Sequence, residues 1–435
     1  MPDRHADKPT QRWRLWCGLF ALAALPRLLY LVAMRPLLEG YHWHVSGNLL
    51  TYGFVGQDGL KTSMYEPAYP VFLAASRFVS GDTAVLVQVL QLAIDSVGAV
   101  LLYLLLEART LRRRSALFGA ALYAFYPLLI WHSVVGDEFS LQSVLLVAFA
   151  YSVMTAKTVL RASTAGVWLG IAMLTRAMVA PVAVPTTALF VINRRYRLAL
   201  AFAIAAAAVL SPWLVRNYTI SGVIWPTRGG ENLLHGNSPY TAALLPEYNF
   251  DLLGEYGHAI VARERPDLLI PVPGNAILLD FRDERELDQF YAGLAWEDIR
   301  ARPLRTVRLT LWKVAYFFWP RLVPSRLMQD DTRIVLGPGD EVRVENTRRR
   351  PVVDEIAYTV SYSLVATAAL VGVWIRRRHL SQDAVLWCIV FTFVAIHAIY
   401  FPATRYRVPM EFVLLFYAAV AFDAKLPVRA ARART

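Results

Sequence analysis

The sequence has few charged residues and almost no cysteine for its length of 435 residues. Charged side chains make up 18% of the chain, whereas soluble domains average about 25%. The two cysteines, Cys17 and Cys388, both lie inside apolar stretches and give no sign of a disulfide framework. The chain also lacks the nucleophile-elbow, phosphate-loop, dinucleotide-binding and H-E-x-x-H patterns, so none of these motifs identifies its chemistry.

Apolar residues are what the sequence has in excess, at 56% of the chain. They gather in blocks of about 16 to 23 residues, the length that a helix needs to cross a bilayer. The net charge of +12 comes from arginines that flank these blocks, a pattern typical of the cytoplasmic loops of membrane proteins. The sequence therefore predicts an all-α polytopic membrane protein and argues against a nucleic-acid partner.

The distribution of basic residues predicts the topology. Residues 1–14 carry four basic side chains, which places the N-terminus in the cytoplasm. With about ten spans, every later basic cluster and the C-terminal tail also fall on the inner side, and no removed signal peptide is expected. The predicted spans are 15–34, 84–106, 115–134, 139–156, 198–215, 353–375, 384–401 and 408–426, together with two short helices that form a hairpin over 164–185.

Three regions follow from this topology. The first, 1–215, is a transmembrane module whose first outer loop (35–83) holds two short helices, over 41–52 and 67–81. The second, 216–352, is a long extracytoplasmic loop with an amphipathic helix over 284–300. We expect an interfacial helix over 303–320, because a span there would move the arginines at 376–378 to the outer side. The third, 353–435, holds the last spans and a basic tail.

Acids and arginines from separate loops collect on the predicted outer face. An enzyme that acts on a lipid phosphate needs a base for the acceptor hydroxyl and fixed cations for the phosphate. Both are present there, although each residue taken singly is equally explained as a solvated loop charge. The outer residues are Glu39, His42, His44, Asp58, Glu66, Asp137, Glu138, Arg176, Arg216, His235, Arg405 and Arg407.

Simpler explanations exist for several of these residues. Glu138 is also a favourable acid at a helix start, and Arg176 is also placed to extend towards the membrane surface. Arg405 and Arg407 run against the usual inner bias of positive charge, which favours a function. His42 and His44 are two residues apart and so face different sides of a helix. No cofactor is predicted, and a divalent metal has no support beyond these two histidines.

Five local patterns, in order, resemble the membrane-embedded C-type glycosyltransferases, in particular the bacterial branch related to protein O-mannosyltransferases and aminoarabinose transferases. The first is SGNLLTYGF followed by YEPAYPVFLAA. The second is YPLLIWHSVVGDEF, and the third is GIAMLTRAMVAP. The fourth is LSPWLVRNYTISGVIWPT with ENLLHGNSP, and the fifth is ATRYRVPM. They occur in family order across residues 35–410.

The resemblance implies an inverting enzyme of the bacterial inner membrane. It would take a sugar from a polyprenyl-phosphate carrier and give it to a hydroxyl of a lipid, glycan or protein on the extracytoplasmic side. The first-loop acid, Glu39, would be the base, with Glu138 or Asp137 assisting. The remaining site residues that it implies are Arg176, Arg216, Arg405 and Arg407 for the carrier phosphate, and His42, Tyr65, Tyr69, His235, Asn237 and Tyr406 for the substrates.

One departure from the family pattern leaves two alternatives open. The family has an aspartate where this chain has Leu38, so either Glu39 replaces it or the chain is a weak or inactive relative. Glu66 also stands before Pro67 where the family often has another residue. The rival functions are a transporter or flippase of lipid-linked sugars and a non-catalytic subunit that binds polyprenyl phosphate. The absence of repeats and the paucity of charge within the spans favour the enzyme over the transporter.

Overall fold

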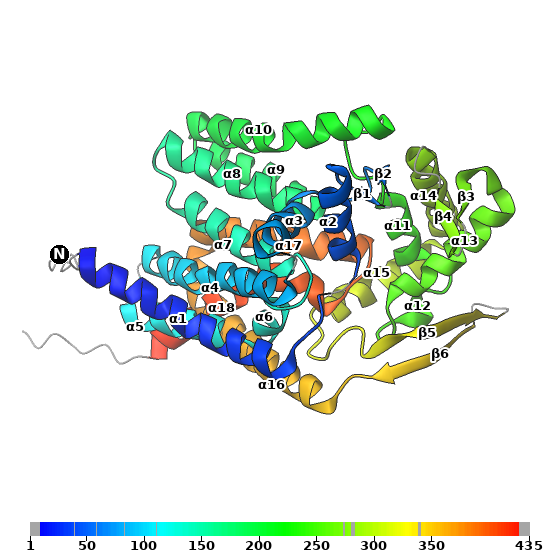
Figure 1. Ribbon diagram of the computed structural model, residues 1–435. Coiled ribbons are helices and arrows are strands. Elements are labelled where there is room, and N and C mark those ends of the chain that lie inside the picture. Colours follow the sequence, from blue (N-terminus) through cyan, green and yellow to red (C-terminus); the bar gives the residue numbers. More distant parts are fainter. Residues whose placement is uncertain are drawn as a thin grey trace, which may run out of the picture.

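Helices packed side by side form most of the molecule, with short helices and hairpins gathered at one end of the bundle (Figure 1). The computed structural model describes residues 9–38, 40–57, 59–81, 83–109, 111–272, 275–279, 283–337 and 341–425. Four helical segments within them are long and apolar enough to cross a membrane: Thr10–Met34, Ala84–Ala108, Tyr196–Ser221 and Val352–Ile399. The predicted all-α membrane fold is confirmed, whereas the number of about ten spans stays a prediction.

The N-terminal part of the bundle follows the predicted order of helices. Its longest members, α1, α4 and α10, correspond to predicted spans, and α8, η1 and α9 form the predicted hairpin. The bounds are α1 Pro9–Met34, α4 Ala84–Ala108, α5 Arg113–Phe125, α6 Pro127–His132, α7 Phe139–Met154, α8 Val159–Thr175, η1 Ala177–Val182, α9 Ala183–Ile192 and α10 Tyr196–Ser221.

Two predicted continuous helices were wrong in their bounds. The span over 115–134 breaks at Tyr126, which is extended (φ −74°, ψ 115°) between α5 and α6. Pro127 causes the break, because a residue that precedes proline avoids the helical conformation. The last helix, α18, begins at Glu411 and not at 408, since the turn η6 (Thr404–Met410), which contains Pro409, comes before it.

The C-terminal helices complete the bundle by packing against the N-terminal part. They are α16 (Val352–Arg376), the short turn η5 (Arg377–Asp383), α17 (Ala384–Ile399) and α18 (Glu411–Lys425). α16 lies against α18, and α18 lies against α5. The approach of α16 to α18 needs a glycine, because a Cβ on Gly372 would lie 1.9 Å from the carbonyl oxygen of Tyr417.

The first outer loop folds as predicted, into α2 (Tyr41–Tyr52) and α3 (Ala68–Ser80). A small hairpin, β1 (Gly56–Gln57) with β2 (Leu60–Lys61), connects them. α2 ends at Gly53, whose φ of 76° is the left-handed conformation that glycine adopts freely. The loop therefore presents two short helices at one end of the bundle, and the connection before α3 begins with three buried residues, 62–64.

The long loop contains more structure than the sequence predicted. The predicted amphipathic helix is α14 (Glu284–Ala301), and the predicted interfacial helix is α15 (Pro303–Phe317). Two antiparallel hairpins, β3–β4 and β5–β6, were not predicted, and β5–β6 projects from the molecule (Figure 1). The other elements are α11 Gly229–Asn237, α12 Thr241–Leu244, η2 Phe250–Leu252, α13 Leu253–Glu264, η3 Pro266–Leu268, β3 Leu269–Val272, β4 Asn275–Leu279, β5 Arg326–Leu336 and β6 Val342–Arg349.

Two aspartates join the helices at the end of the bundle away from the long loop. The carboxylate of Asp383 in η5 pairs with Arg109 at 3.1 Å and with Arg376 at 2.5 Å. Asp423 of α18 accepts a hydrogen bond of 2.6 Å from the hydroxyl of Ser115. The C-terminal end of α4 and the N-terminal end of α5 are thereby tied to the C-terminal helices.

A buried ion pair lies within the bundle, where the sequence predicted spans poor in charge. Arg27 of α1 and Asp95 of α4 are both fully buried, and their side chains are 2.5 Å apart. Asp95 also accepts a hydrogen bond of 2.9 Å from Ser140, and Arg27 donates to the carbonyl of Ala124 at 3.0 Å. The pair thus links α1, α4, α5 and α7 with its polar atoms satisfied.

Candidate active site

A cavity of about 760 Å³ opens at the end of the bundle that carries the long loop. The first outer loop, the start of α7, the turn after α8, the long loop and the segment between α17 and α18 contribute its walls. The polar and aromatic side chains that line it are Tyr41, His42, Tyr65, Glu66, Asp137, Glu138, Phe139, Arg176, Trp225, Arg228, Asn232, Asp251, His397, Tyr400, Phe401, Arg405 and Tyr406.

Glu138 and Arg176 form an ion pair in the wall of this cavity. Glu138 directly precedes α7, and Arg176 directly follows α8, so that the turns of two neighbouring helices bring the side chains together. One carboxylate oxygen of Glu138 accepts a hydrogen bond from Arg176, and the other lies 2.8 Å from Nε2 of His42. Burial alone would raise the pKa of Glu138, but Arg176 and His42 hold it well below its usual range.

A second arginine lies close to Arg176, with a tyrosine between the two. The guanidinium of Arg176 is 4.8 Å from the centre of the Tyr406 ring, and Arg405 donates a hydrogen bond of 3.1 Å to the Tyr406 hydroxyl. The nearest carboxylate to Arg405 among the described residues is that of Asp251, 3.9 Å away. Arg405 is therefore less neutralised than Arg176, and both face the same cavity.

Glu66 enters the cavity from the first outer loop. Its Oε1 accepts a hydrogen bond of 2.7 Å from the backbone N–H of Ala177, the residue after Arg176. Burial raises the pKa of Glu66, although the positive charge of Arg176 partly opposes the shift. The sequence marked Glu66 as an outer acid but not as a site residue, and the signal that pointed to it was its departure from the family pattern.

Asp137 lines the cavity beside Glu138 but is held by its own partners. Its Oδ2 lies 2.6 Å from Nδ1 of His132, and its Oδ1 accepts a hydrogen bond of 3.3 Å from the N–H of Phe139. His132, which is buried in α6, was not among the predicted site residues. This pairing fixes the turn that carries both acids into the cavity.

Arg228 lies on the wall formed by the long loop and was also missed. Its guanidinium is 5.6 Å from the centre of the Tyr65 ring, and its Nε donates to Glu231 at 3.0 Å. Tyr65 in turn packs on Tyr41, with ring centres 3.9 Å apart. Nothing in the sequence linked Arg228 to the first outer loop, because the two segments are far apart in the chain.

Five of the predicted site residues do not line the cavity; they hold the surrounding structure together. Arg216 donates to the carbonyls of Thr62 and Val55. Arg407 pairs with Glu411 at 2.6 Å and donates a hydrogen bond to the carbonyl of Phe317. Asn237 accepts a hydrogen bond from Lys313 and donates one to the carbonyl of Ile399. His235 lies 3.9 Å from Glu231, and the hydroxyl of Tyr69 donates a hydrogen bond of 2.7 Å to Gln91. Their predicted contact with a ligand stays a prediction, while the structure shows them in contacts within the protein. Glu39 and Asp58 lie outside the described residues.

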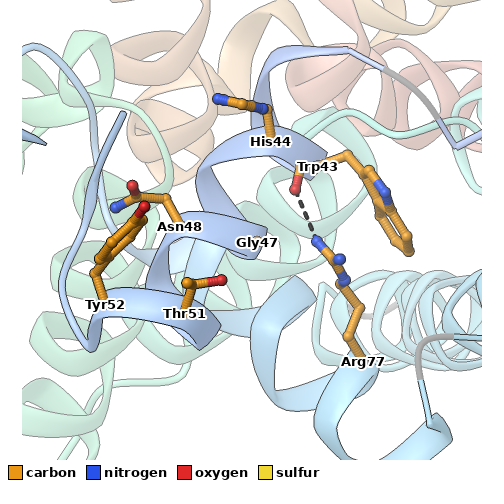
Figure 2. Close-up of a pocket in the computed structure, with 7 residues that line it drawn as sticks. All are labelled: Trp43, His44, Gly47, Asn48, Thr51, Tyr52 and Arg77. Atoms are coloured by element: carbon orange, nitrogen blue, oxygen red, sulfur yellow. Dashed lines mark hydrogen bonds between the residues drawn. The ribbon is translucent and has the colours of Figure 1, made fainter. Parts of the chain in front are cut away.

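The two histidines of α2 point to different places, as their spacing predicts. His42 faces the large cavity, whereas His44 lines a separate pocket of about 330 Å³ together with Trp43 and Arg77 (Figure 2). Arg77 of α3 donates a hydrogen bond of 2.8 Å to the carbonyl of Trp43 and stacks 4.1 Å from the centre of its ring. Within the described part of the chain, no group of three or more His, Cys, Asp or Glu side chains is arranged to hold a metal ion.

The fold is similar to that of the oligosaccharyltransferase of Archaeoglobus fulgidus in its apo form. That structure aligns with a TM-score of 0.51 and 15% identity, over 94% of this chain and 50% of its own, so this chain spans about half its length. The likeness confirms the predicted fold, a bundle of packed helices, at the level of the fold alone.

Two structures of ArnT from Cupriavidus metallidurans, one apo and one bound to undecaprenyl phosphate, align less closely. Each has a TM-score of 0.38 and 14% identity, over 94% of this chain and 78% of its own. No protein-family model matches the sequence, and the search of curated proteins returned no match.

Proposed function

We propose that the protein is a membrane glycosyltransferase that moves a sugar from a polyprenyl-phosphate carrier to a hydroxyl group of an acceptor. The observation that carries the proposal is the cavity, where Arg176 and Arg405 lie beside four carboxylates at one end of an apolar bundle. The likeness of the fold to an oligosaccharyltransferase supports it, as do the five sequence patterns that resemble C-type glycosyltransferases.

The arginines are suited to the leaving group of such a reaction. When the bond between the sugar and the phosphate breaks, negative charge grows on the phosphate oxygens, and fixed guanidinium groups stabilise it. Arg405 has its nearest described carboxylate 3.9 Å away, so it is available for a new anion. Arg176 would share its charge between Glu138 and the phosphate, and Tyr406 lies between the two arginines.

The reaction also needs a base, because the acceptor hydroxyl must lose its proton as it attacks the sugar. A single displacement of this kind inverts the anomeric carbon. The acceptor, whether lipid, glycan or protein, would approach past the long loop, whose residues Trp225, Arg228, Asn232 and Asp251 line the cavity. In this proposal the sugar donor and the acceptor meet in the cavity, between the first outer loop and the long loop.

The rival transporter function would need a path through the bundle. The end of the bundle opposite the cavity is tied by Asp383 and Asp423, and the polar cavity lies at the end that carries the long loop. We therefore favour the enzyme, with the cavity on the extracytoplasmic side and both termini in the cytoplasm, in a bacterial inner membrane. A subunit that binds carrier without turnover is the remaining alternative, and the experiment below separates it.

The test is sugar transfer by purified protein in detergent. Radiolabelled polyprenyl-phosphate sugars serve as donors, and a membrane extract supplies the acceptors. Wild type should move label from the carrier to the extract, and Arg405→Ala should lower this rate at least tenfold. Arg343→Ala, an exposed arginine on β6, is the matched control and should keep it. Carrier binding without transfer in every extract would establish the non-catalytic subunit instead.

A further inference from the structure

Glu66 is held in place by a rigid segment of the first outer loop. The connection 62–67 is fixed from outside the loop, because Arg216 donates to Thr62 O at 2.9 Å and Glu284 accepts from Ser63 N at 2.9 Å. Thr62, Ser63 and Met64 are buried. The carboxylate that follows is anchored by the N–H of Ala177 and still borders the cavity. Such a side chain is positioned before any substrate arrives.

The other three acids of the cavity are occupied. Glu138 has one oxygen on Arg176 and the other on His42. Asp137 has one oxygen at His132 and the other at the N–H of Phe139. Asp251 accepts a hydrogen bond of 2.7 Å from the side chain of Asn249, and its own side chain is about half exposed to solvent. In Glu66, by contrast, Oε2 receives no hydrogen bond from any other residue of the described chain.

We propose that Glu66 is the catalytic base, which accepts the proton of the acceptor hydroxyl through Oε2 while the Ala177 N–H holds Oε1. This inference rests on the proposed function. It assigns to Glu66 the role that the sequence resemblance gave to Glu39, which lies outside the described residues. The neighbouring Arg176 would hold the phosphate next to the anomeric carbon. The base and this cation are adjacent because Glu66 is bonded to the N–H of Ala177, the residue after Arg176.

The electrostatic surroundings of Glu66 suit a base better than those of Glu138. Burial raises the pKa of Glu66, with Arg176 opposing the shift and Glu138 adding to it, and the phenol of Tyr41 is a further titratable group whose charge couples to it. A carboxylate with a raised pKa takes up a proton more readily. The pKa of Glu138 is shifted the other way by its two partners, so that it remains an anion and a weak base.

The step balances without a further reactant. The acceptor oxygen forms a bond to the anomeric carbon as the bond from that carbon to the phosphate oxygen breaks. The electron pair of the broken bond stays on the polyprenyl phosphate, beside Arg176 and Arg405. The proton of the acceptor hydroxyl passes to Glu66, which returns it to water when the product leaves.

The decisive variant is Glu66→Gln. Its amide oxygen can still accept the hydrogen bond of Ala177 N–H, so a residue that only caps the turn η1 would be replaced without loss. As a base, however, the amide fails, and we expect turnover to fall about 10²–10⁴-fold. Binding of polyprenyl phosphate and the melting temperature should stay close to wild type. Glu247→Gln, at an exposed glutamate that pairs with Arg326 outside the cavity, is the matched control.

The pH profile gives a readout that a structural role would not move. Wild-type turnover should fall on the acid side, as Glu66 becomes protonated at a pH above the ordinary range of a glutamate, and the residual turnover of Glu66→Gln should lack this fall. Glu66→Asp should keep the fall and lose part of the rate, and this variant decides the matter if the glutamine variant does not fold. An aspartate variant with an unchanged rate would then overturn the proposal.

The remaining outcomes separate the base from the function. If wild type transfers sugar and Glu66→Gln transfers it within twofold of that rate, the role of Glu66 is overturned and the proposed function stands. If Glu39→Gln removes transfer and the acid fall while Glu66→Gln keeps both, the base is Glu39. If wild type transfers no sugar from any carrier tried, the proposed function fails, and the role of Glu66 fails with it.

Discussion

The carboxylate of Glu138 and the guanidinium of Arg176 are paired, although 37 residues separate them in the chain. One residue precedes α7 and the other follows α8, so the pair closes the turns of two neighbouring helices. The sequence had proposed a separate task for each. Their contact means that a phosphate which binds Arg176 must share it with Glu138.

The Glu138–Arg176 pair predicts how stability depends on pH. The folded state lowers the pKa of Glu138 below its ordinary value of 4.5. The stability that the ionised Glu138 contributes is therefore fully present above that pH and is lost as the pH falls below it. Glu138→Gln should lower the free energy of unfolding by about 1.5–3 kcal/mol at pH 7, and the difference should shrink at pH 4 and below. Unfolding in detergent at several pH values measures this. A difference that grows with acid would contradict it.

Arg405 and Arg216 should respond differently to removal. Arg405→Ala removes a cavity cation and should weaken binding of polyprenyl phosphate about 10- to 100-fold, the effect of one or two charge-assisted hydrogen bonds. Arg216→Ala releases the carbonyls of the first outer loop and should lower the melting temperature first. Binding of labelled carrier and thermal unfolding, measured on both variants, distinguish the two. Equal losses of affinity with unchanged melting would restore Arg216 as a phosphate ligand.

The Arg27–Asp95 pair should contribute strongly to stability. Asp95→Ala leaves a buried guanidinium without its partner, which costs about 3–5 kcal/mol. The double variant Arg27→Met/Asp95→Leu removes both charges and should recover most of that loss. Unfolding of the three proteins in the same detergent is the measurement. The pair would be unimportant to the fold if Asp95→Ala melted like wild type.

Gly236 should be needed for the shape of the cavity. A Cβ at this position would lie 2.0 Å from the carbonyl oxygen of Tyr400, which lines the cavity. Gly236→Ala should therefore shift that wall and lower sugar transfer at least tenfold. Gly254→Ala is the control, because a Cβ on Gly254, in the first turn of α13, would have no atom within 4 Å, and this variant should keep the wild-type rate of sugar transfer. Transfer that survives Gly236→Ala would show that the wall adapts.

Local patterns were enough to predict most helices. The helix over 41–52 was predicted with the bounds that α2 has, because its apolar residues repeat with helical spacing. The helix over 284–300 was predicted for the same reason. The kink at Tyr126 was missed because the apolar run continues across Pro127, and apolarity alone does not reveal a break. Hairpin β5–β6 was missed because its strands carry many charges and no regular alternation.

The sequence predicted only part of the site. It shows which residue types lie on the outer face, but it does not show the direction in which each side chain points. His42, Glu138, Arg176 and Arg405 stand at element boundaries on one predicted face, and all four line the cavity. Arg407 stands two residues from Arg405 and has the same charge, yet it turns into the bundle to pair with Glu411. Only the packing of α16 and α18 decides between these directions. Arg228 was missed because Tyr65, which it meets in the cavity wall, is distant in the chain. His132 was missed although its partner, Asp137, lies only five residues further along.

The anchoring of the bundle by Asp383 and Asp423 has a mechanical consequence. These contacts clamp the ends of α4, α5 and α18 on one side, whereas the cavity side is closed by turns and by the helices of the two outer loops. When the helices of a bundle are fixed at one end, their largest displacements occur at the other end. A ligand that enters the cavity is therefore expected to move the cavity end of α17 more than its other end, which is held through Asp383.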